Sequence, residues 1–477
     1  MATYKVVDAD QLNADMTIVA DSIRTKGGTT EALAWPDGYK TAIEAIQTGG
    51  GGGSSSDPLD PVEVYNNTRP SDWLPMPTPA DNELYLLFHI PDGVSSLLAF
   101  TVTCTGNYTV ALGTVSNGAF VQMSSTTVAS GSKYEAELFA DDYGNLTSDG
   151  MKQVMVKVSG TDILTWAPST HSKKTSPSDF EGWNIVEIAC NIPSGTSVAC
   201  GGSSGNSALK NLRYFAWYGK NAVTNMDGMF AYCSSMTAIP QLDTSSVTSM
   251  AGMFAGCSSM TAIPQLDTSS VTDMSSMFEE CIVLMTIPQL DTSSVTSMVG
   301  MFAYCHALTT IPQLDTSSVT SMAGMFAGCS SMTAIPQLDT SSVTDMSNMF
   351  AYCHALTTIP QMNTSSVTNM SSMFDECIVL MTIPQLDTSA VTDMRYTFSA
   401  CFYLTAIAFN GSVTGWAGCA VSLTDCSLGH AAIVSFFNSL PTITSAKAIT
   451  LTGNPGVSEL TDAEKAIATG KGWTLTL

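Results

Sequence analysis

The sequence is poor in basic residues: 17 Lys and Arg stand against 41 Asp and Glu, which gives a formal net charge of −24. No lysine or arginine occurs between Asn221 and Met394. Binding to nucleic acid needs a basic face that neutralises phosphates, so the composition excludes that class of partner. The chain also has no run of 18 apolar residues, and its first residues turn polar too early for a secretory leader. We therefore expect neither membrane insertion nor a signal peptide.

The sequence also lacks motifs that are typical of metal-dependent and phosphate-binding enzymes. It contains no H-E-x-x-H and no glycine-rich phosphate loop, and its five histidines lie in different segments. The adjacent acids Glu279–Glu280 and Asp375–Glu376 would point apart on a helix, so we expect a charged surface there. Cys305–His306 and Cys353–His354 lie two repeats apart, roughly 10 Å in a stack, too far to share one zinc ion. We therefore expect solvated surface histidines, no catalytic residues, no metal centre and no cofactor.

The dominant feature that is present is a repeat of 24 residues with the pattern V-T-x-M-x-x-M-F-x-x-C-x-x-[LM]-x-x-I-P-x-L-D-T-S-S. A period of this length, with leucine and isoleucine at fixed positions, is typical of leucine-rich solenoids, in which each repeat stacks on its neighbours. Such molecules present long surfaces for binding. Eight consecutive repeats begin at Val223, Val247, Val271, Val295, Val319, Val343, Val367 and Val391.

The apolar positions within one repeat have the spacing of a short helix. In the second repeat, Met250, Met253, Phe254 and Cys257 occupy positions i, i+3, i+4 and i+7. This spacing predicts a two-turn helix whose apolar stripe faces inward. Thr248 precedes the stripe, where we expect its hydroxyl to act as the N-cap.

Each repeat ends in a polar D-T-S-S segment that is typical of a turn. Stacking would bring the aspartates of neighbouring repeats about 5 Å apart, where they repel by roughly 0.8 kcal/mol in water. Either the carboxylates accept hydrogen bonds from the turn, or a cation such as Ca²⁺ lies between them. The first alternative is favoured because Asn363 keeps the turn chemistry without the charge. The column consists of Asp243, Asp267, Asp291, Asp315, Asp339 and Asp387.

Variation among the repeats is concentrated beside the repeated cysteine, which is how a binding surface on a constant framework is diversified. We therefore predict a receptor-binding patch there, and neutral surface drift is the alternative explanation. The predicted patch consists of Tyr232, Tyr304, His306, Tyr352 and His354.

Eight of the thirteen cysteines recur at one position of the repeat, on the stripe expected to face inward. We expect buried free thiols, because the missing export signal argues against disulfides even though the stacking distance would permit them. The eight are Cys233, Cys257, Cys281, Cys305, Cys329, Cys353, Cys377 and Cys401.

The segments before the repeats differ from them in composition. Residues 1–48 contain Leu12, Met16, Val19 and Ile23 at coiled-coil spacing, which predicts a helical unit for oligomerisation, with a trimer as our choice. Residues 49–56 are five glycines and three serines, a flexible linker. Residues 57–207 alternate apolar and polar positions between turn signals, which predicts an antiparallel β-sandwich of roughly eight strands.

Tryptophans in this region suggest two roles. Trp73, Trp166 and Trp183 could form a platform for sugars, but a position in the core or at its rim is the favoured interpretation.

Residues 208–222 then read as the N-terminal cap of the solenoid, residues 223–410 as the repeats, and residues 411–477 as an α/β cap with two helices and two strands.

The phrases M-F-x-x-C-x-x-L and L-D-T-S-S-V-T-x-M resemble the leucine-rich repeats of BspA-type bacterial and mycoplasmal surface proteins. The segment from Leu423 to Thr476 is similar to the cap that accompanies such repeats in proteins of Firmicutes and their phages. The segments Tyr4–Leu12, Ala20–Gly28 and Trp35–Gly38 resemble the start of tail proteins in these phages.

These resemblances imply a multidomain virion adhesin, located in the phage tail, that binds a glycan or protein receptor on the bacterial surface. Residues 1–48 would attach it to other tail proteins. A bacterial cell-surface or secreted adhesin of the same repeat family is the alternative, and an enzyme acting on envelope polysaccharide is a third, less favoured reading.

Overall fold

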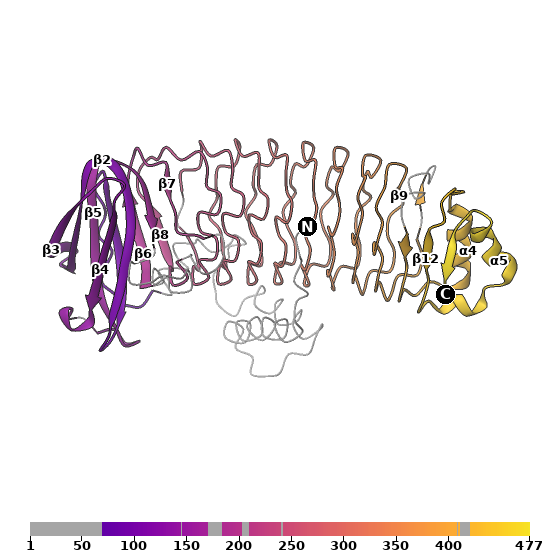
Figure 1. Ribbon diagram of the computed structural model, residues 1–477, viewed down its shortest axis with the longest axis horizontal. Helices are drawn as coiled ribbons and strands as arrows, with labels where there is room; N and C mark the ends of the chain where they lie inside the picture. The colour runs from indigo at the N-terminus through magenta and orange to yellow at the C-terminus, as the bar shows by residue number, and fades with distance from the viewer. Residues whose placement is uncertain are drawn as a thin grey trace, which may run out of the picture.

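The computed structural model describes residues 69–144, 146–169, 184–202, 209–239, 242–407, 409–410 and 420–477. A β-sheet forms one end of an elongated molecule, a stack of chain turns forms the middle, and an α/β unit forms the other end (Figure 1). The predicted helical unit 1–48, the linker 49–56 and Trp183 lie outside the described residues. In the described part, no helix has the length and apolar character needed to cross a bilayer.

The sheet contains eight strands, most of them antiparallel. The hydrogen-bonded order is β3-β2-β5-β1-β6-β8, while β4 pairs with β2 and β7 pairs with β5. A short 3-10 helix, η1 (Ala140–Asp142), follows β4. The strands are β1 (Glu83–Pro91), β2 (Ser95–Ser116), β3 (Ala119–Ala129), β4 (Lys133–Phe139), β5 (Met151–Pro168), β6 (Ile185–Asn191), β7 (Ser197–Val198) and β8 (Tyr214–Trp217).

The predicted antiparallel strands are present, and they share one hydrogen-bond network instead of forming two separate sheets. The long strand β2 pairs with β4 over Ser95–Thr101 and with β3 over Asn107–Ser116. Its register to β5 shifts between these two parts. Trp73 and Trp166 are both buried, which agrees with the structural role favoured for them.

The sheet also covers the first repeat. Strand β8 lies in the region predicted as the N-terminal cap, and it pairs in parallel with β6. Its Phe215 ring lies 5.1 Å from the Phe230 ring of the first repeat, centroid to centroid. Cys200 N donates a 3.0 Å hydrogen bond to Met229 O. The apolar core therefore continues from the sheet into the repeats without interruption.

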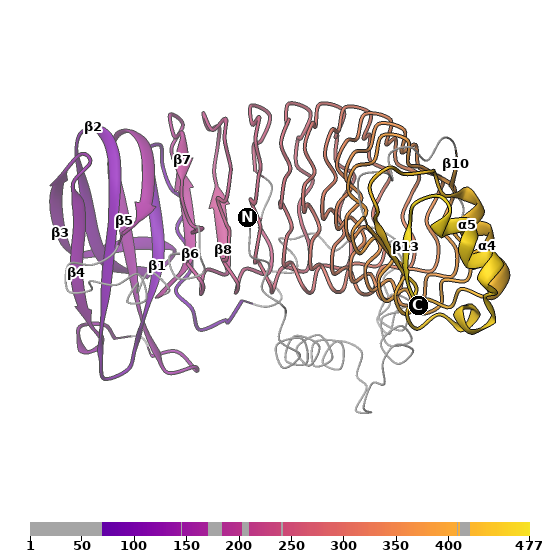
Figure 2. The same ribbon diagram turned by 45° about the vertical axis from the view of Figure 1, so that its right-hand side comes forward.

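Each repeat forms one turn of the stack, here called a rung, and the rungs follow one another toward the C-terminal unit (Figure 2). The prediction of a helix in each rung was wrong: no α-helix occurs in residues 223–239 or 242–407. In the second rung, Met253 N donates to Met250 O at 3.1 Å, whereas Phe254 N donates to Met277 O of the next rung at 3.0 Å. Backbone amides thus alternate between their own turn and the neighbouring rung.

The physical reason is a left-handed backbone at two positions of the rung. Gly252 and Gly256 have φ of +61° and +71°. The equivalent residues in the third rung, Ser276 and Glu280, have φ of +53° and +58°. A right-handed helix cannot contain residues with positive φ, so the chain turns twice and its amides point to the next rung.

The predicted N-cap role of Thr248 was also wrong. Its backbone N–H and its hydroxyl both donate to Thr224 O of the preceding rung, at 2.8 and 3.1 Å. The same double contact recurs down the stack, for example from Thr272 to Thr248. These threonines therefore join neighbouring rungs.

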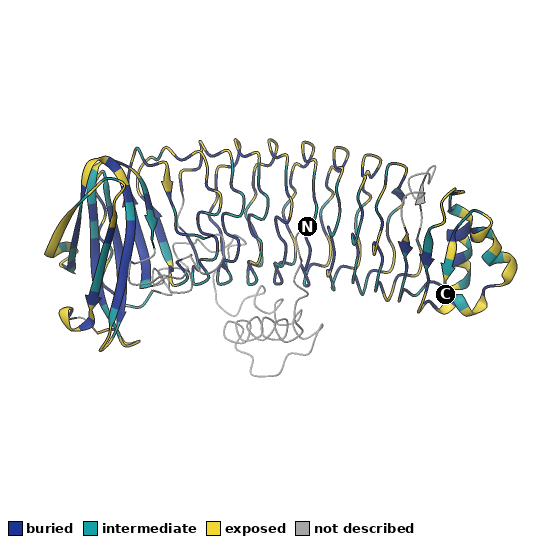
Figure 3. Cartoon of the chain, viewed as in Figure 1, coloured by how far each residue is buried: buried dark blue, intermediate teal, exposed yellow. Residues whose placement is uncertain are grey.

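The apolar spacing nevertheless identified the core residues. Met250, Met253, Phe254 and Cys257 are fully buried, and buried residues recur along the rungs of the stack (Figure 3). The phenylalanine rings stack from Phe230 to Phe398 with centroids 5.6–5.9 Å apart and interplanar angles of 4–11°. The described cysteines are free and buried, as expected, and Cys257 Sγ donates to Phe230 O at 3.1 Å.

The C-terminal unit contains the helices and strands expected from the sequence. Its parallel sheet has the order β11-β12-β13, and β10 pairs with β9 of the last rungs. Cys426 Sγ donates to Phe398 O at 3.1 Å, so the row of cysteines continues into this unit. The elements are β9 (Leu386–Asp387), β10 (Phe409–Asn410), β11 (Val421–Ser422), α4 (His430–Ser439), β12 (Ala448–Thr450), η5 (Pro455–Glu459), α5 (Asp462–Thr469) and β13 (Thr474–Thr476).

A capping box begins helix α5 and gives a pH dependence. The backbone N–H and the hydroxyl of Thr461 both donate to the Glu464 carboxylate, and His430 Nε2 lies within hydrogen-bond distance of it. The bonds from Thr461, followed by the contact with His430, lower the pKa of Glu464 from 4.5 to about 2. Because the folded pKa is the lower one, the carboxylate stabilises the fold above pH 4.5, and this contribution is lost as the pH falls toward 2. We expect Glu464→Gln, which keeps an accepting oxygen, to show a smaller drop of thermal midpoint between pH 5 and pH 2.5 than the wild type. Equal drops would contradict this assignment.

Candidate functional site

A groove with a volume of about 1360 Å³ runs along one side of the stack. Leu290, Leu314 and Leu338 form its floor, and each is buried. A row of glutamines forms one wall and part of the predicted aspartate column forms the other, while Asp243 and Asp267 of that column lie outside the groove lining. The two rows are Gln265, Gln289, Gln313, Gln337, Gln361 and Gln385, and Asp291, Asp315, Asp339, Asn363 and Asp387.

The glutamine amides are held by the backbone. Gln289 Nε2 donates to Gln313 O of the next rung at 2.8 Å and to Leu290 O at 3.1 Å. The same pair of bonds recurs at Gln265, Gln313, Gln337 and Gln361. Both N–H groups of each of these five amides are therefore engaged, and the amide oxygen is the part left for a ligand.

The aspartates adopt the turn role that the sequence favoured. Asp315 Oδ1 accepts from Ser317 N at 3.0 Å and from Ser317 Oγ at 2.7 Å. Both hydrogen bonds lower the pKa of Asp315 below its ordinary value, and the bond from the Ser317 hydroxyl has the larger effect. Asn363 accepts the same two bonds from Ser365, at 3.1 and 2.8 Å. The turn therefore forms with either residue, and the charge is not needed for it.

The remaining hydroxyl donors of the groove are also engaged. Thr316 Oγ1 donates to Asp339 O of the next rung at 2.8 Å, and the other threonines of this row do the same. The second carboxylate oxygens of Asp291, Asp315 and Asp339 accept no hydrogen bond from a described residue. The groove therefore presents oxygen acceptors and negative charge to a ligand, and its own donors are used up.

The cation alternative for this column stays a prediction. In the described part of the chain, no three His, Cys, Asp or Glu side chains are grouped so that they could hold a metal ion. The hydrogen bonds from the serines account for one oxygen of each aspartate without any ion.

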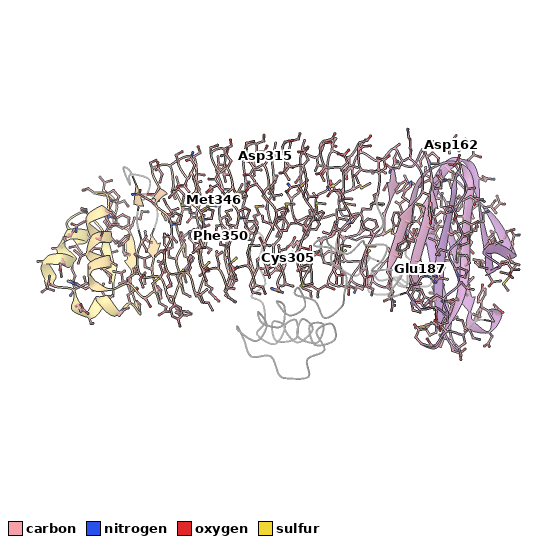
Figure 4. The ribbon with its side chains drawn as sticks, turned by 180° about the vertical axis from the view of Figure 1, so that it is seen from behind. Asp162, Glu187, Cys305, Asp315, Met346 and Phe350 are labelled. Atoms are coloured by element: carbon pink, nitrogen blue, oxygen red, sulfur yellow. The ribbon has the colours of Figure 1, made fainter. Side chains whose placement is uncertain are left out.

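The tyrosine–histidine patch predicted beside the cysteines lies away from the groove. Figure 4 shows Asp315 near one long edge of the stack and Cys305, the neighbour of His306, toward the opposite edge. Tyr304 and His306 form an edge contact with ring centroids 6.2 Å apart, and Tyr352 and His354 do so at 6.3 Å. Tyr304 and Tyr352 thus each contact their own histidine, whereas Tyr232 has Ser234 at that position.

The expectation of solvated histidines was wrong for His306. The His306 side chain is buried, and its Nδ1 lies 2.9 Å from Gly328 O of the next rung. His354 is half-buried with Nε2 3.7 Å from Glu376 Oε2, and burial lowers its pKa. Tyr352 is exposed, whereas Tyr232 and Tyr304 are half-buried. Tyr352 is the most exposed member of the predicted patch.

The repeats are similar to a known family. Residues 206–307, 259–356, 282–377 and 332–433 match the family model described as Mycoplasma protein of unknown function, DUF285. No curated protein matches. A crystal structure of a TLR13–ssRNA13 complex is similar at 12% identity and a TM-score of 0.26, over 56% of this chain and 40% of that chain. The chain spans well under half of that solved chain's length. The repeat region is thus similar to the BspA-like proteins of this family.

Proposed function

We propose that this protein is a non-enzymatic adhesin that binds a polymer on the bacterial surface through the groove along its rungs. The observation that carries the proposal is the set of acceptors in the groove, repeated from rung to rung. Neighbouring rungs lie close together, as the ring stacking distance of 5.6–5.9 Å indicates. A polymer with regularly spaced donors would engage several rungs at once, and such multivalent contacts add avidity.

The chemistry of the groove favours ligands that donate hydrogen bonds. Hydroxyl groups of a glycan fit the free oxygens of the glutamines and aspartates, and amino groups fit them better because they also neutralise charge. The basic residues that an anionic polymer would need are missing between Asn221 and Met394. An amine-bearing glycan is therefore the preferred ligand class.

For the biological setting we propose a phage tail fibre, in which residues 1–48 attach to other tail proteins and promote a homo-oligomer. The resemblance of those residues to the start of phage tail proteins supports this setting. A bacterial cell-surface or secreted adhesin is the second candidate, supported by the family match of the repeats. Antibody labelling of purified phage particles separates the two, since only a tail protein decorates them.

The groove is tested with the double variant Asp315→Asn and Asp339→Asn in the full-length protein. Asn363 shows that asparagine keeps the turn, so the variant removes charge and leaves the fold intact. We expect binding to chitosan, an amine-bearing glycan, to weaken at least tenfold, because each charge-assisted hydrogen bond is worth about 1.5–3 kcal/mol.

The control removes two charges elsewhere, with Asp162→Asn and Asp345→Asn, and is expected to bind like the wild type. Neither residue lines the groove. The wild type should bind neutral dextran more weakly than chitosan. Unchanged chitosan binding by the groove variant would refute the proposed role of the groove.

A further inference from the structure

A second pocket, of about 230 Å³, lies where the sheet meets the first two rungs. Its character is opposite to that of the groove, because donors line it. The lining includes Arg69, Trp73, Arg213, Ser235, Thr237 and Ser259. We call this set the junction pocket.

Arg69 is committed to an internal ion pair. Arg69 Nε and Nη2 donate to the two oxygens of Glu187 at 2.8 and 2.9 Å, and Nη2 also donates to Leu74 O at 2.6 Å. Glu187 is fully buried in the sheet, which raises its pKa, and the charge of Arg213 opposes that rise. Arg69 thus balances the charge of Glu187 and fixes one wall of the pocket.

Arg213 supplies a second positive charge, and its guanidinium forms no ion pair with another described residue. Its guanidinium lies 5.1 Å from the centroid of the Trp73 ring, a cation–π distance. The side chain is exposed, and its guanidinium donates no hydrogen bond to another described residue. Arg213 is therefore held in place by the indole while its N–H groups remain available to a ligand.

Further donors converge on the same pocket. The indole of Trp73 is 4% exposed, and its Nε1 has no hydrogen-bond partner within the described residues. Trp166 and Trp217 share this property, but neither lines the pocket. The hydroxyls of Ser235, Thr237 and Ser259 also make no hydrogen bond to a described residue. The unpaired hydroxyl groups and the Arg213 guanidinium therefore leave donors on the pocket wall for a ligand that accepts hydrogen bonds.

The other charges nearby are engaged elsewhere. Asp72 Oδ2 accepts from Ser148 N at 2.6 Å, and neither Asp72 nor Asp149 lines the pocket. His89 contacts the edge of Trp73, and burial lowers its pKa to about 4, so it is neutral at neutral pH. Arg69 and Arg213 are the charged groups on the pocket wall.

We propose that the junction pocket binds an oxyanion, a phosphate or carboxylate group, with Arg213 and the three hydroxyls as its ligands. Guanidinium groups bind the oxygens of these anions in pairs, and serine and threonine hydroxyls supply the remaining bonds. The pocket has room for one such group with part of a sugar attached to it. The anion comes either from a surface polymer or from free phosphate, and this site is independent of the groove.

The test uses isothermal titration of the full-length protein at constant ionic strength with inorganic phosphate, glucose 6-phosphate, glucuronate and glucose. We expect the three anions to bind and glucose not to bind. Arg213→Gln should lower anion affinity at least tenfold, and Thr237→Val should lower it by a smaller factor. Lys220→Gln removes an exposed positive charge outside the pocket lining and should bind like the wild type.

Circular dichroism confirms that each variant is folded before titration. Tighter binding of the sugar-bound anions than of inorganic phosphate assigns the site to a polymer, whereas equal affinities assign it to free anions. Absence of heat with all three anions overturns the proposal, and so does wild-type affinity in Arg213→Gln. Loss of affinity in Lys220→Gln equal to that in Arg213→Gln would show a general charge effect and would also overturn it.

Discussion

Deleting residues 247–318 is expected to give a shorter protein that folds, whereas deleting residues 247–306 is expected to give one that does not. The first deletion removes three whole repeats, and the second removes two and a half. The sequence of Val319–Ser342 is identical to that of Val247–Ser270. The fifth rung therefore replaces the second on top of the first without changing a single side chain at the new junction.

The contacts at that junction explain the expected difference. In the native chain Phe254 stacks on Phe230 at 5.8 Å, and Gly256 lies against the ring of Tyr232, where a Cβ would approach to 2.5 Å. The longer deletion restores both contacts through Phe326 and Gly328. The shorter deletion joins Ser246 to Ala307, so the next rung consists of residues 307–318 alone and lacks the methionines, phenylalanine and cysteine of the apolar stripe. Interface energies in a stacked repeat are local, so a correct junction suffices for folding.

Thermal unfolding followed by circular dichroism measures the outcome. The deletion of whole repeats should retain a cooperative transition, with a lower total free energy of unfolding because three interfaces are missing. The half-repeat deletion should lose its transition or aggregate. Equal behaviour of the two proteins would mean that the rungs do not depend on their register.

The variant Phe302→Ala is expected to lose about 3–5 kcal/mol of unfolding free energy, the usual effect of removing a buried phenylalanine. Phe302 is fully buried, and its ring lies 5.7 Å from both Phe278 and Phe326. Main-chain bonds on both sides hold the rungs apart at this distance, including Phe302 N to Met325 O at 2.9 Å. The neighbours therefore cannot collapse into the cavity, and the loss should lie near the upper end.

Phe402→Ala serves as the matched control for this measurement. Phe402 is 49% exposed and lies in the eighth rung. Its truncation should change the free energy of unfolding by less than about 0.5 kcal/mol. Urea unfolding of both variants measures the difference. A loss below about 1 kcal/mol for Phe302→Ala would contradict a rigid stack.

The sequence predicted which side chains are buried but gave the wrong local backbone. Apolar residues at i, i+3, i+4 and i+7 face one side of a helix, and they also face one side of a chain that turns twice. The distinguishing signal was the recurrence of Gly252 and Gly256, with Asn348 and Gly328 at the same positions in other rungs. Glycine and asparagine tolerate positive φ and are poor choices inside a helix.

The groove was half predictable and the junction pocket was not. The turn role of the aspartates followed from D-T-S-S, because Asx turns are local. The glutamine wall was missed, although a glutamine recurs in the first seven repeats where no turn requires it, and that recurrence was the available signal. Arg69, Trp73 and Arg213 meet through pairing between distant strands, which periodicity does not encode.

The bonds between rungs lie along the length of the molecule, and this orientation determines its response to force (Figure 1). Tension applied between the two ends loads the rungs in series, so they open one after another from an end instead of breaking together. Each opened rung releases roughly 80 Å of extended chain. The molecule therefore lengthens under tension while its unopened rungs keep their stacking.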